Sequence, residues 1–208
     1  MSTVLQILVL MTVLSIAPAI LLMTTSFIRI VVVLSFLRQA MGTQQMPPNQ
    51  IIIGLAVFLT FFIMAPVFTQ INENALQPYL QEKVDGRRAL ETAVAAMRDF
   101  MFRHVREADL ELMTRISGTE EPPRTRDDIS TLTLIPAFML SELKQAFQIG
   151  FMIFVPFLVI DMITASVLMT MGMLMLPPII ISLPFKVLLF VLVDGWNLVV
   201  GSLMQGFY

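Results

Sequence analysis

Residues 51–71 read IIIGLAVFLTFFIMAPVFTQI and contain no charged side chain. As an α-helix with a rise of about 1.5 Å per residue, a stretch of this length covers about 30 Å, the thickness of the hydrocarbon core of a bilayer. The pattern therefore predicts a membrane-spanning helix. It decides the fold class that we expect, which is an all-α integral membrane protein built on helical hairpins.

The composition of the whole chain favours the same class. Apolar residues make up 57% and charged residues 13% of the 208 residues, and the mean hydropathy is +0.83. Soluble domains average about 45–50% apolar and about 25% charged residues. A chain this apolar cannot bury its own apolar surface, so lipid or partner helices must cover it.

Several classes of function find no support in the composition. The net charge of −2 gives no electrostatic footprint for nucleic acid. The absence of cysteine excludes disulfides and thiolate metal sites. The only histidine, His104, has no HExxH context, and neither a P-loop nor a G-x-S-x-G string occurs. We therefore expect no enzyme activity, cofactor, metal site or nucleic-acid partner.

The charges divide the chain into three parts. Residues 72–130 hold nine of the 13 bases and twelve of the 15 acids. We therefore expect an N-terminal hydrophobic helical hairpin over 1–71, a polar insert over 72–130, and C-terminal hydrophobic helices over 131–208. Within the hairpin, the apolar stretch 4–37 would be about 50 Å long as one helix. It must tilt, kink at Pro18 or be buried among partners.

The polar insert opens with residues that disfavour a helix, Pro78 and the pair Asp85-Gly86, so we expect a helix-poor segment there. After that, apolar side chains recur every three or four residues, which predicts one amphipathic helix over 87–116 that ends near Gly118. The apolar stripe consists of Leu90, Val94, Met97, Met101, Val105, Ala108 and Leu112. Its simplest interpretation is a packing face, although such a stripe can also dock a partner.

The C-terminal block predicts a broken segment followed by an ordinary span. We expect 132–160 to be interrupted by polar residues and broken at Pro156, because proline lacks the N–H and restricts the residue before it. A shorter segment, 162–176, ends at Pro177-Pro178, and 179–200 follows as an ordinary span. Irregular backbone at membrane depth needs cover by protein or a water-filled cavity, which favours an assembly over a lone bundle.

Seven charged residues lie outside the insert, where an ionisable side chain is expensive unless it faces an interior or a cavity. They are Arg29, Arg38, Glu142, Lys144, Asp161, Lys186 and Asp194. Glu142, Lys144 and Lys186 are the best candidates for ion pairs between helices or subunits, and for Glu142 and Lys186 we favour pairing across a subunit boundary. Snorkelling to the membrane interface is the alternative, above all for Arg38 and Lys144. Further buried charges are expected at Arg29, Lys144, Asp161 and Asp194.

The run MTMGMLMLPP at 169–178 does not resemble a generic span. A glycine inside it and two prolines at its end indicate a loop or a re-entrant turn. Several flexible thioethers can re-pack around an irregular object, so one interpretation is a deformable constriction. The alternative is ordinary core packing, the usual role of methionine in a span. The constriction would comprise Met171, Gly172, Met173, Leu174, Met175, Pro177 and Pro178.

Four segments in order, over nearly the whole chain, carry a resemblance to a known family. They are TTSFIRIVVVLSFLRQAMGTQQMPPNQ (24–50), FFIMAPVF (61–68), LSELKQAFQIGF (140–151) and MGMLMLPPIIISLPFKVLLFVLVDGWNLVVGS (171–202). These segments resemble the FliP family of flagellar export-gate proteins, whose injectisome counterpart is the SctR/YscR family. Within the insert, INENALQPYL (71–80) and MRDFMFRHVREADLELM (97–113) favour the flagellar branch.

The resemblance implies a multi-pass protein of the bacterial inner membrane, inside the flagellar basal body, with the insert on the extracytoplasmic side. Several copies would form a ring-like gate with FliQ-like and FliR-like subunits, beside FlhA-like and FlhB-like export components. The gate would pass unfolded flagellar proteins, and an injectisome gate is the alternative. The methionine ring of the family maps onto Met173, Leu174 and Met175, and its inter-subunit ion pair maps onto Glu142 and Lys186.

Two rival hypotheses belong to other classes of protein. A secondary ion transporter that used the buried charges should show internal symmetry between its halves, and the sequence shows none. An intramembrane protease would need Asp161 and Asp194 as a carboxylate dyad, and nothing in the sequence places them together. We therefore expect a structural, pore-forming subunit that catalyses nothing.

Overall fold

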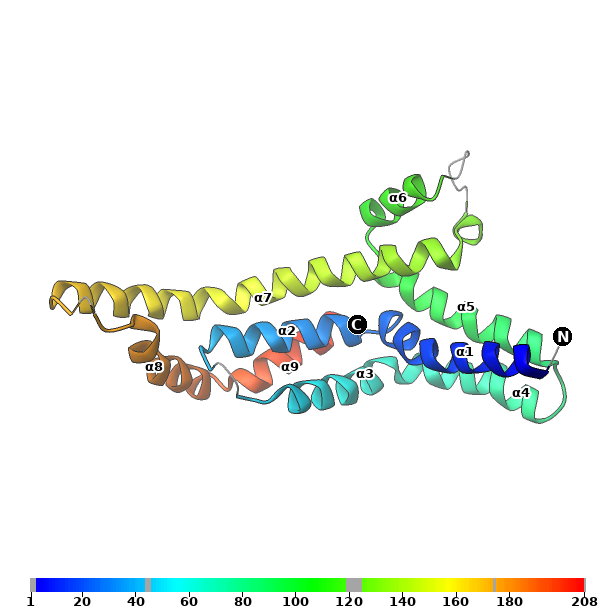
Figure 1. Cartoon of the computed structure of the whole chain (residues 1–208), viewed down its shortest axis with the longest axis horizontal. Coiled ribbons are helices and arrows are strands. Elements are labelled where there is room, and N and C mark those ends of the chain that lie inside the picture. Colours follow the sequence, from blue (N-terminus) through cyan, green and yellow to red (C-terminus); the bar gives the residue numbers. More distant parts are fainter. Residues whose placement is uncertain (1–2, 44–45, 119–124, 174, 208) are drawn as a thin grey trace. The chain divides into compact units, whose positions relative to one another are not determined.

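The computed structural model describes residues 3–43, 46–118, 125–173 and 175–207. Over these residues the regular structure is helical throughout, and no strand occurs (Figure 1). Two helical runs are long and apolar enough to span a membrane, Asn49–Leu80 and Thr131–Thr170. Two pairs of shorter helices, each interrupted by a bend, raise the number to four if each pair counts as one span. The prediction of an all-α membrane protein is confirmed.

Contacts divide the chain into two compact units. Unit 1 comprises Met1–Ile28 and Thr60–Leu143, and unit 2 comprises Arg29–Leu59 and Lys144–Tyr208. Three helices contribute residues to both units, namely α2 (Phe27–Ala40), α3 (Asn49–Ile71) and α7 (Thr131–Thr170). The division of the sequence at residues 71 and 130 follows composition rather than contacts, and it stays a prediction.

Unit 1 contains the polar insert. Its elements are α1 (Thr3–Met23), η1 (Asn72–Leu76), α4 (Gln77–Leu80), α5 (Gly86–His104), α6 (Glu107–Ile116) and η2 (Arg126–Asp128), with the adjoining parts of α3 and α7. Asp85 caps α5, because its carboxylate accepts a hydrogen bond from the backbone N–H of Arg88 (3.0 Å). Phe100 of α5 packs edge-on against Phe138 of α7, with 5.9 Å between the ring centroids. Both rings are buried, so they form part of the core of this unit.

The insert is helical as far as Leu80, so the prediction of a helix-poor segment is wrong at Pro78, whereas it is confirmed at residues 81–85, which form no helix. Helices α3, η1 and α4 follow one another without a gap, and Pro78 lies in the first turn of α4. A proline ring in an ordinary α-helix collides with the carbonyl group four residues earlier. Here the preceding turn, η1, is a π-helical turn in which the backbone N–H of Gln77 donates to Asn72 O. This wider turn accommodates the proline.

The amphipathic stretch forms two helices, so the prediction of a single helix over 87–116 is wrong. Val105 and Arg106 are extended, with ψ of 138° at both, and they separate α5 from α6. The backbone N–H of Arg106 donates instead to the hydroxyl of Ser141 on α7 (3.0 Å). A tertiary hydrogen bond replaces a helical one, which sequence periodicity cannot reveal. The stripe is also only partly buried, since Leu90 is exposed.

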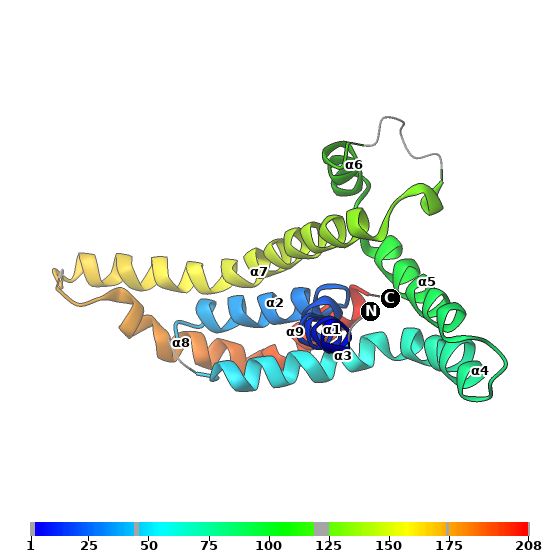
Figure 2. The same cartoon turned by 45° about the vertical axis from the view of Figure 1, so that its right-hand side comes forward.

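Unit 2 gathers α2, the first part of α3, the end of α7, α8 (Pro178–Leu192) and α9 (Gly195–Gln205). Figures 1 and 2 show α2 beside α9. Helix α2 also meets α7, where the rings of Phe36 and Phe147 pack edge-on with 5.2 Å between their centroids. At Gly150 of α7 an added Cβ would lie 2.7 Å from the ring of Phe36. Glycine at this position therefore permits the close approach of the two helices.

The first apolar stretch breaks at residues 24–26 rather than at Pro18. Helix α1 continues through Pro18 and ends at Met23. The hydroxyl groups of Thr24 and Thr25 then donate to the carbonyl groups of Ile20 (2.9 Å) and Leu22 (3.3 Å). Such side-chain bonds to the preceding turn compete with the helical backbone bonds. The break therefore falls at residues 24–26, where two threonine hydroxyl groups bond to the preceding turn, and not at the proline.

Helices α2 and α3 are joined by a short turn, and the hairpin domain over residues 1–71 stays a prediction. Arg38 at the end of α2 donates to Asn49 Oδ1 at the start of α3 (2.6 Å) and to Pro47 O (3.3 Å). Gly42 takes a left-handed φ of +75° in the turn, a conformation that glycine adopts without strain. The guanidinium of Arg38 thus holds the two ends of the turn together.

Helix α7 is a single helix of 40 residues, so the predicted break at Pro156 and the separate segment 162–176 are both wrong. A proline removes one backbone hydrogen bond. In an apolar setting, however, the remaining backbone groups have no partner outside the helix. The helix therefore continues past Pro156 to residue 170, where backbone hydrogen bonds from Gly172 and Met173 cap it.

The predicted ordinary span over 179–200 is also wrong, because it is divided into α8 and α9 with a bend of 63° between them. Asp194 takes a left-handed φ of 51° at the bend. At Gly195 an added Cβ would lie 2.2 Å from the ring of Phe190. An Asp-Gly pair satisfies both demands, since aspartate tolerates the left-handed region and glycine permits the close approach. The pair was a turn signal that the apolar surroundings concealed.

Candidate functional site: the methionine turn and the charges behind it

The methionine turn, residues 171–177, joins α7 to α8. It begins with a Schellman cap, in which Met173 N donates to Leu168 O (3.0 Å) and Gly172 N donates to Met169 O (3.1 Å). Gly172 supplies the left-handed φ of +75° that this cap requires. Pro178 is the first residue of α8, where its missing N–H has no helical partner to lose. The turn is therefore fixed by backbone chemistry at both ends.

The methionines of this turn lie on the outside of the chain. Met171 is 64% exposed and Met175 is 97% exposed, while Met173 is half-buried. Leu174, the middle position of the predicted constriction, lies outside the described residues. A cluster of exposed thioether side chains on a fixed turn is an apolar surface that a single chain does not use for its own core.

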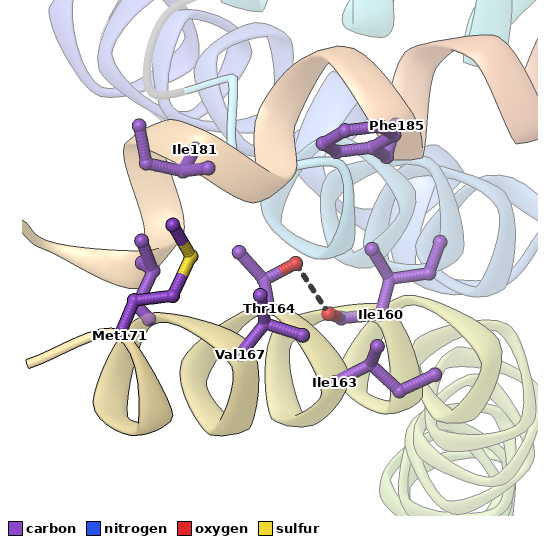
Figure 3. Close-up of a pocket in the computed structure, with 8 residues that line it drawn as sticks. Ile160, Ile163, Thr164, Val167, Met171, Ile181 and Phe185 are labelled. Carbon is purple, nitrogen blue, oxygen red and sulfur yellow. Dashed lines mark hydrogen bonds between the residues drawn. The ribbon is translucent and has the colours of Figure 1, made fainter.

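An apolar groove of about 460 Å³ lies between the end of α7 and the start of α8 (Figure 3). Its lining residues are Ile160, Ile163, Thr164, Val167, Leu168, Met171, Ile181 and Phe185. Thr164 is the polar residue among them, and its hydroxyl donates to Ile160 O within α7 (2.9 Å). Figure 3 shows Met171 reaching from the end of α7 towards α8. The turn therefore adjoins free apolar space into which its side chains can move.

A cluster of charged and polar side chains joins α7 and α8 further from the turn. The ammonium of Lys186 lies 2.6 Å from Asp161 Oδ2, and Ser182 Oγ donates to Asp161 Oδ1 (2.5 Å). Lys186 also donates to Ala40 O at the end of α2 (3.2 Å). The side chain of Lys186 is 4% exposed and that of Asp161 is 28% exposed. We call Asp161, Ser182 and Lys186 the Asp161 cluster.

Glu142 is fully buried in unit 1, whereas Lys186 belongs to unit 2. The residue before it, Ser141, accepts from Arg106 N and lies 3.0 Å from Asp109 Oδ2. The ion pair between Glu142 and Lys186 of neighbouring copies stays a prediction. Within one chain, the structure assigns Lys186 the partner Asp161.

The other sparse charges differ in their burial. Arg29 is 1% exposed, donates to Gly206 O (3.0 Å) and stacks on the ring of Phe207 at 3.7 Å from its centroid. Lys144 and Asp194 are exposed on the single chain, and their burial within an assembly stays a prediction. Lys144 points away from the face that buries Glu142, because residues two apart on a helix face different sides. Asp194 lies at the bend between α8 and α9.

Comparison with known proteins decides the family. A profile of the FliP family matches residues 10–203 of this chain. The flagellar biosynthetic protein FliP of Bacillus subtilis (strain 168) is 56% identical over 206 residues, which cover 99% of this chain and 93% of that protein. The FliP proteins of Caulobacter vibrioides and Aquifex aeolicus are 53% and 48% identical, covering 98% and 97% of this chain and 76% and 85% of their own lengths.

The chain belongs to the FliP family. It is thus a helical membrane component of the flagellar export apparatus. The methionine turn and the Asp161 cluster both lie inside the region that matches the FliP family. Among the described residues, no group of three or more histidine, cysteine or acidic side chains could hold a metal ion.

Sequence reasoning on this FliP-family chain missed the partnership of Asp161 with Lys186. The signal was present in the sequence. Asp161 precedes Leu174 by 13 residues and Lys186 follows Met173 by 13 residues, so the midpoint between the two charges falls between Met173 and Leu174, inside the turn. Two residues at equal distances from the centre of an antiparallel helical hairpin lie level with each other. The hairpin had first to be recognised, and the expected break at Pro156 obscured it.

Proposed function

We propose that this chain is a pore-forming structural subunit of the flagellar type III export gate, through which unfolded flagellar proteins cross the bacterial inner membrane. The observation that carries the proposal is the methionine turn, which holds Met171 and Met175 exposed on a backbone fixed by a Schellman cap. Turns from several copies that meet around a channel would form a flexible apolar seal. Methionine suits this task because its side chain re-packs at low cost.

The candidate spans support an assembly of several chains. In their most apolar windows only 33% and 11% of the residues are buried within the chain. Other copies, FliQ-like and FliR-like subunits, and lipid would cover the remainder, and FlhA-like and FlhB-like components would adjoin the gate. The polar insert would lie on the extracytoplasmic side. In this proposal the chain acts by its shape and catalyses nothing.

Two branches of protein export use gates of this type, and the comparisons favour the flagellar one. The matched relatives from Bacillus, Caulobacter and Aquifex all carry the name of a flagellar biosynthetic protein. An injectisome gate is therefore the less favoured alternative. Motility restored to a flagellar FliP deletion strain by this chain would support the flagellar assignment.

The proposed seal is tested by measuring ion leakage. Cells that co-express the chain with its FliQ-like and FliR-like neighbours carry either the native sequence or Met173→Ala with Met175→Ala. We expect the variant gate to assemble and to leak more ions, because smaller side chains leave the seal incomplete. The matched control is Met162→Ala with Met169→Ala, which alters two exposed methionines of α7 outside the turn. Equal leakage from both variants in assembled gates would refute the proposal.

The ion pair between copies is tested by exchanging its charges. Glu142→Lys and Lys186→Glu should each prevent assembly, and the double variant should restore it. A carboxylate at position 186 would also repel Asp161, which lies 2.6 Å from the native ammonium. The exchange is therefore repeated with Asp161→Asn. Absence of rescue in both backgrounds would argue against direct pairing of Glu142 with Lys186.

A further inference from the structure

We propose that a groove between α2, α3 and α9 binds an acyl chain of an anionic phospholipid, and that Arg38 binds the phosphate of the same lipid. The groove has a volume of about 200 Å³ and lies within unit 2. Its lining residues are all apolar, namely Leu34, Pro47, Ile51, Ile52, Leu55 and Trp196. Sites for amphipathic ligands combine such an apolar wall with a few polar groups that fix the orientation of the ligand.

The groove lies where a candidate membrane span begins. That span starts at Asn49, and Ile51, Ile52 and Leu55 belong to its first turns. The end of a span lies close to the headgroup region of a bilayer. A phospholipid beside this end of α3 therefore has its phosphate level with the start of the helix and its acyl chain beside the groove. A groove of this volume admits a narrow chain but not a helix, whose diameter with side chains is about 10–12 Å.

The guanidinium of Arg38 lies at one edge of the groove. Its Nη1 donates to the carbonyl oxygen of Pro47 (3.3 Å), which is a lining residue, and to Asn49 Oδ1 (2.6 Å). Both acceptors are neutral, and no carboxylate among the described residues pairs with Arg38. Because both bonds use Nη1, the N–H groups on Nη2 and Nε remain for a ligand.

The chemistry of this edge favours an anionic headgroup. A guanidinium binds phosphate oxygens through charge-assisted hydrogen bonds, often two in parallel. Basic side chains close to the membrane surface attract anionic lipids more strongly than zwitterionic ones, whose own cation balances the phosphate. The positive charge of Arg38 therefore selects the class of lipid, whereas the apolar wall of the groove binds its chain.

Trp196 forms part of the wall of the groove and makes the site observable. It is the only tryptophan of the chain and is 43% exposed. Its ring packs edge-on against Phe190, with 5.5 Å between the ring centroids, which fixes the indole in place. Tryptophan is enriched at membrane interfaces, because its ring is apolar and its N–H is polar. An acyl chain in the groove would contact this ring.

The site is tested by quenching the fluorescence of Trp196. The purified chain in mild detergent is titrated with phosphatidylglycerol or with phosphatidylcholine, each carrying bromine on its acyl chains as a contact quencher. We expect half-maximal quenching at a phosphatidylglycerol concentration about fivefold lower than for phosphatidylcholine, the factor expected of one basic side chain near an anionic headgroup. The net charge of −2 gives the chain no general attraction for anionic lipids, so such a preference arises at the site.

Two variants separate the headgroup from the acyl chain. Arg38→Met removes the charge and should make the two lipids quench at equal concentrations. Ile51→Phe narrows the groove but leaves Arg38 in place, so it should weaken quenching by both lipids. The matched control Ile53→Phe makes the same change at an exposed residue of α3 that does not line the groove, and it should behave like the native chain.

Three results would overturn the proposal. Equal quenching of the native chain by both lipids would show that Trp196 only faces bulk lipid. An absence of quenching would show that a second copy or another helix covers the groove. A preference that persists in Arg38→Met would contradict the role of Arg38. If Arg38→Met does not fold, Ile51→Phe decides, because weaker quenching than in Ile53→Phe supports the site and equal quenching overturns it.

Discussion

The two ends of the α7–α8 hairpin are built in opposite ways. The methionine turn is exposed and apolar, and backbone hydrogen bonds with one left-handed glycine determine its shape. The base is mostly buried and charged, and side-chain contacts among Asp161, Ser182 and Lys186 hold it. The described residues of the turn thus form no side-chain hydrogen bonds, whereas the Asp161 cluster forms them in a medium where they are hard to break.

The largest expected effect comes from removing the ammonium at the base. Lys186→Met should lower the free energy of unfolding by about 2–4 kcal/mol, because removing one partner leaves a largely buried carboxylate unpaired. Thermal unfolding of the purified protein in detergent measures it. Lys144→Met is the matched control, and it should change little because Lys144 is exposed. If both variants lowered the free energy of unfolding equally, the buried ammonium would stabilise the chain no more than an exposed one does.

The far end of α8 also packs closely, where the ring of Phe190 lies against the backbone of Gly195. Gly195→Ala should destabilise by about 1–3 kcal/mol, because the added Cβ would lie 2.2 Å from the ring of Phe190. Gly201→Ala, in the same helix with nothing within 4 Å of the added carbon, should be neutral or stabilising by up to about 1 kcal/mol. The same unfolding measurement compares the two. A harmless Gly195→Ala would contradict the close packing at the bend.

The cap of the methionine turn should give a smaller effect. Gly172→Ala places a side chain at a φ of +75° and should destabilise by about 1–2 kcal/mol. Gly54→Ala, in a regular part of α3 with open space around it, is the control and should not destabilise. If Gly172→Ala also increases ion leakage, the shape of the turn matters for the seal as well as for stability.

The smallest effect on stability is expected at the exposed methionine itself. Met175 is 97% exposed, so Met175→Ala should change the free energy of unfolding of the isolated chain by less than about 0.5 kcal/mol. Its effect should appear only in the assembled gate, as increased leakage. A strong destabilisation of the isolated chain would show that Met175 belongs to the core of the chain rather than to a surface between copies.

Composition and periodicity were sufficient for the fold class and for some of its turns. The uncharged stretch 51–71 and the Pro-Pro pair at 177–178 correctly predicted a span and a turn. Prolines inside long apolar helices misled the prediction, because Pro18, Pro78 and Pro156 all lie within helical segments. A single lost hydrogen bond does not end a helix whose other backbone groups have no alternative partner.

The remaining errors have a common physical cause in tertiary contacts. The break between α5 and α6 depends on Ser141, which lies 35 residues from Arg106 in the sequence. The pairing of Asp161 with Lys186 depends on α7 and α8 forming a hairpin around the methionine turn. The bend at Asp194-Gly195 depends on the nearby ring of Phe190. Each of these contacts is invisible to a local pattern, although each uses residue types that a local pattern can mark as unusual.

The most direct measurement places a cysteine at position 175 of a chain that has none. Ion current through assembled gates carrying Met175→Cys is recorded before and after a membrane-impermeant thiol reagent is added, with Met162→Cys as the control. The account predicts that the reagent alters the current in Met175→Cys gates and leaves Met162→Cys gates unchanged, because in the proposed gate Met175 lines the channel and Met162 does not. A current that the reagent leaves unchanged in fully labelled Met175→Cys gates would contradict it.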